Sequence, residues 1–278
     1  MPEGPEVDTL RRQIETFLPA TISSVSVTHP RSVRNSVMDL NLLPGSVLSE
    51  VSRYGKWLFI SVTPGALLAS ASDSRELNLW VHLRMSGRLR ISEVSDLREK
   101  HAHVSLYIDT PHGHKRLDFV DPRTFGEVRL SGNQTPDPRN DLSRTQNLKD
   151  VSDKVIKSSK PVKAILLEQG LLVSGVGNYL ADEICHDSKI SPNRPFSSLD
   201  TSEIDELLKA IPAAFRDFTA LRGTALADEG WRDLFDVLGD GSSRLNTHAR
   251  QSCRSCQGPV TRCKIAGRSA YFCPSCQV

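Results

Sequence analysis

The chain has 278 residues, of which 38% are hydrophobic and 24% are charged, and its formal net charge is +2. This length suits two domains, and the hydrophobic content excludes an intrinsically disordered chain. Polar residues interrupt each apolar stretch well before the roughly 20 residues that a membrane-spanning helix needs, so we expect no membrane partner.

The first residues include acids and prolines, whereas a secretory signal has a basic region followed by an apolar one. We therefore expect a cytoplasmic protein whose cysteines are reduced. Charge is unevenly spread along the chain, because residues 245–278 contain five Lys or Arg and no Asp or Glu. This basic end suits contact with phosphates.

The first half of the chain is predicted to consist mainly of strands. An N-terminal helix comes first, since Pro5 precedes apolar residues at helical spacing from Val7 to Leu18. Apolar and polar residues then alternate, as in half-buried strands, within 22–27, 57–62, 77–81, 104–108 and 128–130. The pattern predicts an antiparallel sandwich.

The second half is predicted to begin with helices. Turn-forming residues dominate 131–141, which indicates a linker, and helical periodicity follows in 162–172, 179–185 and 204–215. Asp200 and Glu203 have capping-box spacing before the last of these helices. A glycine turn at 174–178 precedes another, and its free backbone amides suit an anion such as phosphate. We predict domains at 1–132, 146–244 and 245–278, with a linker at 133–145.

Four of the six cysteines form two Cys-x-x-Cys pairs separated by sixteen residues, and they are Cys253, Cys256, Cys273 and Cys276. Two such knuckles supply four thiolates for tetrahedral zinc, and chance placement of four buried cysteines is a poor alternative. A closed set of four thiolates predicts one structural Zn²⁺ without a catalytic role. Cys185 and Cys263 lack this spacing and are expected to pack in the interior.

Further motifs follow one another along almost the whole chain. They are Pro2-Glu-Gly-Pro-Glu-Val7, Tyr54-Gly-Lys-Trp-Leu58, His82-Leu-Arg-Met-Ser-Gly-Arg88, Asp121-Pro-Arg-Thr-Phe-Gly126, Leu166-Leu-Glu-Gln169, Gly175-Val-Gly-Asn-Tyr-Leu-Ala-Asp-Glu183 and Gly267-Arg268 beside the cysteines. In this order, they resemble the bacterial formamidopyrimidine-DNA glycosylase/endonuclease VIII (Fpg/Nei) family.

The resemblance implies an α+β fold. Its N-terminal domain is a two-layered β-sandwich with flanking helices, and its C-terminal part is a helix-two-turn-helix domain with a four-cysteine zinc finger. It also implies a lesion-capping loop within 146–244, damaged double-stranded DNA as partner, a monomeric state, and a place in the bacterial cytoplasm at the nucleoid.

Four residues are the predicted catalytic set. Removal of Met1 would leave Pro2 with a secondary amine whose ordinary pKa, about 8, is close to neutrality, and such an amine can form a Schiff base with a sugar C1′. The resemblance makes Glu3 the general acid/base. It makes Lys56, expected in a strand, a phosphate-contacting and proton-transferring residue. Arg268, expected in the hairpin turn of the finger, would clamp the phosphates beside the lesion.

An enzyme that acts on a base inside a duplex must extrude that base and fill the gap. The resemblance assigns this filling to Met85, Arg123 and Phe125. Core packing is a strong alternative for Met85 or Phe125 taken singly, but both follow strand-like runs beside Gly-containing loops, which favours exposure. The resemblance assigns further DNA contacts to His82, His101, Lys163 and Asn178, while an isolated histidine is more often structural.

The chain departs from the family pattern at four places. Arg84 stands where glycine is expected, the segment between Gln169 and Asn178 is one residue longer, and His248 stands where the family has an aromatic residue before the finger. Residues 223–243, which match the capping loop, differ from the Fpg type in sequence. Lesion preference is therefore the inference that the resemblance supports least.

The sequence predicts a bifunctional enzyme of base excision repair, both a DNA-formamidopyrimidine glycosylase and a DNA-(apurinic or apyrimidinic site) lyase. It would excise 8-oxoguanine or formamidopyrimidines through a Pro2 Schiff base and cleave the strand by β,δ-elimination. One alternative is a Nei-like enzyme for oxidised pyrimidines, and another is a catalytically silent module that binds damaged DNA. A third alternative, an RNA-binding zinc ribbon, would not explain the N-terminal motifs.

Overall fold

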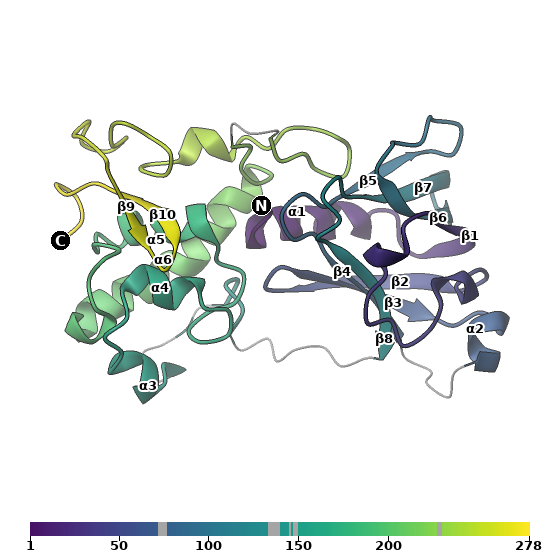
Figure 1. The fold of residues 1–278 in the computed structure, drawn as a ribbon, viewed down its shortest axis with the longest axis horizontal. Helices are drawn as coiled ribbons and strands as arrows, with labels where there is room; N and C mark the ends of the chain where they lie inside the picture. The colour runs from purple at the N-terminus through teal and green to yellow at the C-terminus, as the bar shows by residue number, and fades with distance from the viewer. Residues whose placement is uncertain (72–76, 133–139, 145, 147–149, 227–229) are drawn as a thin grey trace. The chain divides into compact units, whose positions relative to one another are not determined.

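The computed structural model describes residues 1–278 except 72–76, 133–139, 145, 147–149 and 227–229 (Figure 1). The chain divides into two compact units. The N-terminal unit comprises residues 1–2, 6–136 and 225–239, and the C-terminal unit comprises residues 3–5, 137–224 and 240–278. The segment 225–239 thus groups with the first unit, although the predicted boundaries placed it within 146–244. Most of the predicted linker lies outside the described residues.

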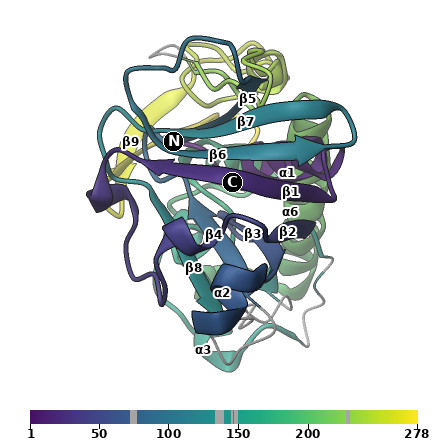
Figure 2. The same cartoon turned by 90° about the vertical axis from the view of Figure 1, so that its right-hand side faces the viewer.

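The N-terminal unit is built on eight antiparallel strands in the order β5-β7-β6-β1-β2-β3-β4-β8. Their bounds are β1 Ala20–Val27, β2 Val47–Tyr54, β3 Trp57–Thr63, β4 Leu77–His82, β5 Arg88–Glu93, β6 Ala102–Thr110, β7 Gly113–Val120 and β8 Glu127–Gly132. Strands β1 and β2 share only two residue pairs, so the sheet folds at this corner into two layers (Figure 2). This is the expected antiparallel sandwich.

The core of this unit lies between the layers and against helix α1, Gly4–Glu15. Val7, Leu10 and Ile14 of α1 are buried there, because their helical spacing gives the helix one apolar face. A short helix α2, Ala66–Ala71, and the single helical turns Pro30–Ser32 and Leu40–Leu42 lie between strands along the chain.

All five predicted strands are present, but β2, β5 and β7 were not predicted. Strand β2 has a register shift between Leu48 and Val51, which interrupts its alternation. Strand β7 begins with exposed Gly113 and His114 and then runs buried from Arg116 to Val120, so neither part alternates. Arg116 is buried because its guanidinium pairs with Asp118 at 2.8 Å.

The segment from Trp231 to Leu238 is attached to α1 and β5 in the N-terminal unit. Gln13 donates through Nε2 to Asp233 Oδ2 at 2.8 Å and accepts at Oε1 from the Leu234 N–H at 2.9 Å. The Ile91 N–H donates to the Leu234 carbonyl at 3.0 Å, and the Leu234 side chain is fully buried. One side chain, Gln13, therefore fixes this turn by both of its amide atoms.

The C-terminal unit contains helices α3 Asp153–Ile156, α4 Val162–Leu167, α5 Asn178–Asp187 and α6 Thr201–Ala220, the turns Phe196–Ser198 and Gly241–Arg244, and a hairpin of β9 Thr261–Ile265 and β10 Arg268–Phe272. The predicted capping box is present, since Asp200 accepts from the Glu203 N–H and the Glu203 side chain accepts from the Asp200 N–H. The helix expected over 162–172 ends at Leu167, because Glu168 is extended and Gly170 has a φ of 81°.

The α+β class is therefore confirmed, with a β-sandwich in one unit and helices with a cysteine-bearing hairpin in the other. Within the described part of the chain, no helix is both long and apolar enough to cross a membrane.

Replacing Gln13 by Ala is expected to release the 231–238 segment while the sandwich stays folded, because two hydrogen bonds of about 1 kcal/mol each are lost. Amide hydrogen exchange should show faster exchange at Leu234 and unchanged exchange in β6. Arg12→Ala, on the same helix but paired with Asp8, is the matched control. Equal protection of Leu234 in Gln13→Ala and wild type would contradict the attachment.

Candidate active site

Glu3 is held by the start of helix α5. Its carboxylate is 2% exposed and accepts from the backbone N–H groups of Gly177 at 2.7 Å, Tyr179 at 3.1 Å and Leu180 at 3.3 Å. The first amides of a helix have no partner within the helix, and their dipoles favour an anion. The predicted anion site at 174–178 exists, but the anion is the Glu3 carboxylate and not a phosphate.

Gly177 leaves room for this carboxylate. A Cβ atom at position 177 would lie 2.3 Å from Glu3 Cδ, so any larger residue would displace the acid. The backbone of Gly177 has φ −125° and ψ −155°, which other residues adopt freely. The requirement for glycine here is therefore one of space alone.

The residues on either side of this contact are also fixed. The Gly4 N–H donates to the Gly175 carbonyl at 2.9 Å, and Gln169 accepts from the Gly175 N–H at 2.9 Å and donates to the Val176 carbonyl at 2.8 Å. The loop that carries Gly177 is thus closed by one amide side chain. Because Glu3 and Gly4 are both bound, Pro2 is attached by one peptide bond to an immobilised chain.

Lys56 lies in the two-residue turn between β2 and β3, not in the strand that the sequence indicated. Tyr54 and Trp57 are the last paired residues, and Gly55 has the positive φ, 57°, that a tight turn requires. Lys56 therefore lies at the end of the hairpin, where it is half-buried.

His82 ends β4 near two cations. Burial first, then Arg84 and Lys56, lower the pKa of His82 from 6.5 to about 3. Its Nδ1 lies 3.0 Å from the Arg84 N–H, which donates to it, so the neutral ring carries its proton on Nε2. His82 is therefore an uncharged hydrogen-bond donor at neutral pH, with cations on either side.

Asp121 joins the two loops that carry the predicted gap-filling residues. This buried carboxylate accepts from Ser86 Oγ at 2.5 Å, from the Gly126 N–H at 2.6 Å and from the Arg123 N–H at 3.3 Å. The 83–87 loop and the 121–126 loop are thus held together within the N-terminal unit.

The three predicted gap-filling residues face solvent on these loops. Met85 and Phe125 are each 47% exposed, and the Arg123 guanidinium lies over the Phe125 ring, 4.8 Å from its centroid. Large apolar side chains are normally buried, so their exposure here is unusual and suits insertion into DNA. Arg84 and Thr124 beside them have positive φ angles of 54° and 56°.

Two of the predicted DNA contacts lie at loop and helix ends. His101 is half-buried and its carbonyl accepts from the Asp121 N–H at 3.0 Å, which places it beside the two loops of the N-terminal unit. Asn178 is the first residue of α5, and no hydrogen bond to its Oδ1 was found within the described residues.

Lys163, which was predicted to contact DNA, has a fully buried side chain. Its ammonium donates to Asp182 Oδ1 at 2.7 Å and to the Ser269 carbonyl at 2.8 Å. A buried lysine must be paired, and Asp182 supplies the charge. Asp182 also lies 2.7 Å from His248 Nδ1 through its second oxygen.

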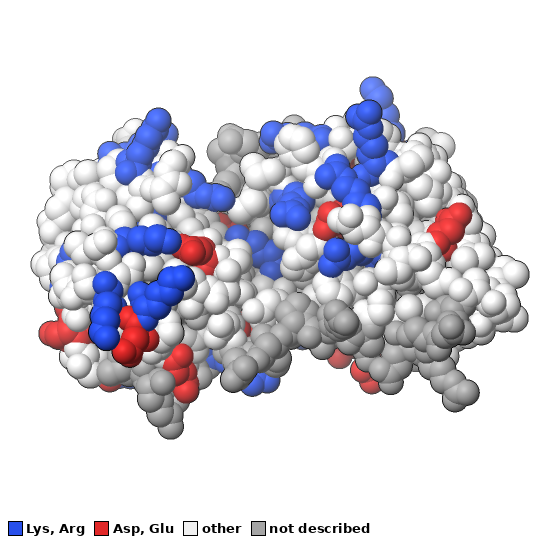
Figure 3. Space-filling view, turned by 60° about the horizontal axis from the view of Figure 1, so that its bottom comes forward, with Lys and Arg blue, Asp and Glu red and all other residues white. Residues whose placement is uncertain are grey.

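Arg268 is the first residue of β10 and is exposed, directly after the turn Ala266-Gly267. The carbonyl that Lys163 binds belongs to the next residue, Ser269. The interior of the unit therefore fixes the backbone from which the Arg268 guanidinium projects into solvent. In the view of Figure 3, Lys and Arg side chains are prominent, and several Asp and Glu side chains lie next to them.

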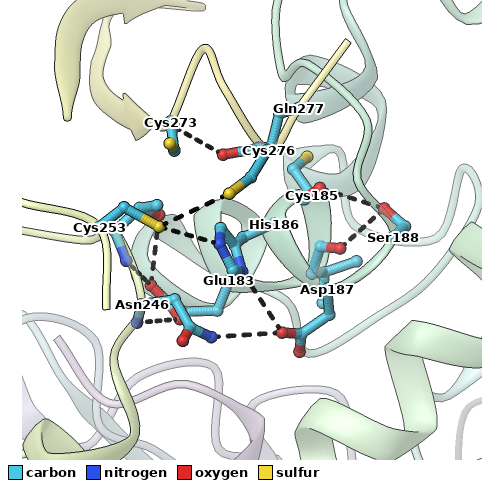
Figure 4. Close-up of polar contacts among 12 residues, drawn as sticks. Glu183, Cys185, His186, Asp187, Ser188, Asn246, Cys253, Cys273, Cys276 and Gln277 are labelled. Atoms are coloured by element: carbon cyan, nitrogen blue, oxygen red, sulfur yellow. Dashed lines mark hydrogen bonds and ion pairs between the residues drawn. The ribbon is translucent and has the colours of Figure 1, made fainter. Parts of the chain in front are cut away.

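The four paired cysteines converge in the C-terminal unit. Their Sγ atoms all lie within 4.8 Å of one another. Cys253 and Cys276 are 3.9 Å apart (Figure 4), and Cys256 and Cys273 are 3.4 Å apart. Four sulfur ligands at this spacing fit a tetrahedral zinc ion. Cys185 is buried on α5, and burial raises the pKa of its thiol, as expected of a packing residue.

Comparison with known proteins decides the family. The model of the formamidopyrimidine-DNA glycosylase N-terminal domain matches residues 1–128, and that of the formamidopyrimidine-DNA glycosylase H2TH domain matches residues 135–227. The chain belongs to the formamidopyrimidine-DNA glycosylase family. Membership makes it a DNA glycosylase, the class of enzyme that begins base excision repair.

Relatives and solved structures of this family cover the whole chain. Formamidopyrimidine-DNA glycosylases of Listeria monocytogenes and Herpetosiphon aurantiacus are 30% and 33% identical to it, each with 100% of both chains covered. The Lactococcus lactis Fpg in complex with DNA containing an abasic site aligns with a TM-score of 0.82 at 28% identity, covering 99% of both chains. A MutM structure with DNA containing carbocyclic 8-oxo-G aligns with a TM-score of 0.81 at 28% identity, covering 99% of both chains.

Sequence reasoning missed the polar residues inside helix α5. Asp182 and Glu183 are fully buried, although both fall within a recognised motif and look like solvated acids in the sequence. Glu183 accepts from the backbone N–H groups of Asn246 at 2.6 Å, Thr247 at 3.0 Å and His248 at 2.9 Å. The available signal was their position among apolar neighbours in a predicted buried helix.

Gly177→Ala is expected to abolish base excision and to lower the free energy of unfolding by about 2 kcal/mol, because the new methyl group overlaps the Glu3 carboxylate. Activity on lesion DNA and urea denaturation measure the two effects. Gly132→Ala, where no atom lies within 4 Å of the added Cβ, should leave activity unchanged. A fully active Gly177→Ala enzyme would show that the bound position of Glu3 is dispensable.

The pH dependence of stability should report on His82. The unfolded chain binds a proton at His82 below about pH 6.5, whereas the folded chain binds it only near pH 3. The contribution of the neutral ring to the free energy of unfolding is therefore fully present above pH 6.5, and it is lost as the pH falls towards 3.

In urea denaturation, the free energy of unfolding of wild type should therefore fall between pH 7 and pH 5. In His82→Gln this fall should be smaller by about 2 kcal/mol. Parallel pH profiles for the two proteins would contradict the lowered pKa of His82.

Proposed function

We propose that this DNA glycosylase is also an AP lyase, which excises 8-oxoguanine or formamidopyrimidines from duplex DNA and then cleaves the strand by β,δ-elimination. The observation that carries the proposal is the Glu3 carboxylate, bound by three backbone N–H groups and joined directly to Pro2. The names of the relatives support the choice of oxidised purines.

Pro2 is the proposed nucleophile. Once Met1 is removed, the lone pair of the Pro2 nitrogen forms a bond to C1′ of the damaged nucleotide while the bond from C1′ to the base breaks. The base leaves as an anion, which takes a proton from water. Glu3 takes the proton that the Pro2 nitrogen releases and passes it to O4′ as the C1′–O4′ bond opens, so that the nitrogen and C1′ are joined as an iminium.

The iminium makes the C2′ proton acidic, so its removal expels the 3′-phosphate, and a second elimination expels the 5′-phosphate. We assign contact with these phosphates to Lys56 and Arg268, since a cation stabilises each departing phosphate. The guanidinium of Arg268 can bind two oxygens of one phosphate.

Extrusion of the lesion leaves a gap in the duplex, which we assign to Met85, Phe125 and Arg123. Apolar groups replace the lost stacking, and the guanidinium meets the partner base. Asp121 would hold both loops in place during insertion. Contacts with the DNA backbone are assigned to neutral His82, His101 and Asn178.

We infer that the four cysteines hold one Zn²⁺, which supplies no chemistry to the reaction and fixes the hairpin that bears Arg268. We further propose that the protein acts as a monomer on damaged double-stranded DNA. Sedimentation of the free protein tests the monomer directly.

Reaction with borohydride on abasic-site DNA tests the nucleophile. The wild type should give a covalent adduct, and Pro2→Gly should lose at least 90% of it, an effect on the order of a tenfold rate change. Pro5→Ala, the other early proline, should keep the adduct. A folded, zinc-containing wild type without any adduct would instead support a DNA-binding module without catalysis.

Lesion preference tests the purine assignment. Excision of 8-oxoguanine opposite cytosine is expected to be at least tenfold faster than excision of thymine glycol opposite adenine, since pocket contacts worth about 1.4 kcal/mol give that ratio. The reverse order would assign the enzyme to oxidised pyrimidines, as in the Nei branch.

A further inference from the structure

His186 lies against the cysteine cluster, near the end of helix α5. Its Nε2 is 3.4 Å from Cys253 Sγ, within hydrogen-bonding distance for sulfur (Figure 4). The side chain is 7% exposed, and Cys253 is fully buried. A donor for this sulfur must therefore come from the protein, whereas exposed Cys256 is open to water.

The other ring nitrogen indicates which proton His186 carries. Within the described residues, no hydrogen bond to Nδ1 was found, and the nearest Asp187 oxygen lies 3.8 Å away. Asp187 is paired instead with Arg244, at 2.5 Å. A proton on Nε2 points to Cys253 both in the neutral ring and in the protonated ring that the ion pair with Asp187 favours.

Such a donor matters when the cluster holds a metal. Zn²⁺ with four thiolates carries a net charge of about −2, and this charge is buried at Cys253. A hydrogen bond to a thiolate withdraws charge from the sulfur, which weakens its reaction with protons and electrophiles. Residues that bind metal ligands in this way commonly change metal affinity by tenfold or more when replaced.

We propose that His186 is a positioning residue of the metal centre, which donates from Nε2 to the Cys253 thiolate and thereby slows metal loss and modification of that sulfur. The inference rests on the proposed four-cysteine zinc site. This hydrogen bond would connect α5 to the first Cys-x-x-Cys pair. Glu183 of the same helix already binds the backbone of residues 246–248. The helix that binds Glu3 at its start thus also protects the finger at its end.

The test compares full-length, zinc-loaded wild type with His186→Phe, which keeps a ring of similar size without a donor. Transfer of zinc to a chromogenic chelator is expected to be about tenfold faster in His186→Phe. Mass spectrometry after limited treatment with iodoacetamide should find Cys253 modified earlier in this variant. Ser188→Ala is the matched control, since Ser188 binds the carbonyls of Ile184 and Cys185 at the same helix end without contacting the knuckle.

Cobalt-loaded protein gives a readout that does not depend on folding stability. Loss of the hydrogen bond raises the energy of the sulfur lone pair, so the sulfur-to-cobalt absorption band should move to longer wavelength in His186→Phe and stay in place in Ser188→Ala. Should His186→Phe fail to fold, the same spectrum of His186→Gln, which keeps an N–H donor, should remain close to wild type.

The outcomes separate the two claims. Wild type without stoichiometric zinc would overturn the metal site and the role of His186 with it. Wild type with zinc, but with zinc transfer within twofold of His186→Phe and an unchanged cobalt band, would overturn only the role of His186.

Discussion

The contact on which the rest of the site depends is the one between the Glu3 carboxylate and the first amides of helix α5. It joins residues more than 170 positions apart, and it is buried, so oriented N–H groups stabilise the carboxylate charge. The position of Glu3 is consequently set by a rigid helix. Because Pro2 precedes Glu3 directly in the chain, the proposed nucleophile and the proposed acid/base share this single support.

Helix α5 serves the rest of the C-terminal unit through a row of buried polar side chains. Asp182 pairs with Lys163 and His248, and Glu183 binds the backbone before the first knuckle. Each of these buried charges would be costly alone, and each is satisfied by partners on helix α4 or in residues 246–248. The helix therefore fixes both the start of the chain and the hairpin of Arg268, which explains why a helix of ten residues carries so many acids.

The N-terminal unit holds large apolar side chains in positions that are exposed to solvent. Met85 and Phe125 lie exposed on loops that are bound to buried Asp121. Gly126 packs closely in the second loop, since a Cβ there would lie 2.9 Å from the His82 carbonyl. Fixed loops lower the entropy cost of ordering on DNA. The neutral state of His82 fits the same surface, since a further positive charge there would be repelled by Arg84 and Lys56.

Much of this was predictable where a local pattern decides the structure. The alternation around Leu79, the Asp200 capping box and the spacing of the cysteines each gave the correct element. Strand β7 was missed because Arg116 is buried by a partner on its own strand, which no period reveals. The burial of Lys163 and the Glu3 carboxylate at the Gly177 turn were not foreseen for one reason: a charged or anion-binding group can be satisfied by a distant part of the same chain.

The most direct test of the account is to locate the bond that the enzyme makes with DNA. The borohydride-reduced adduct should be digested with protease and nuclease, and the modified peptide sequenced by mass spectrometry. The account predicts a sugar remnant on the nitrogen of Pro2, in a peptide that lacks Met1. A remnant on Lys56 or another lysine, or an adduct formed with Met1 still in place, would contradict it.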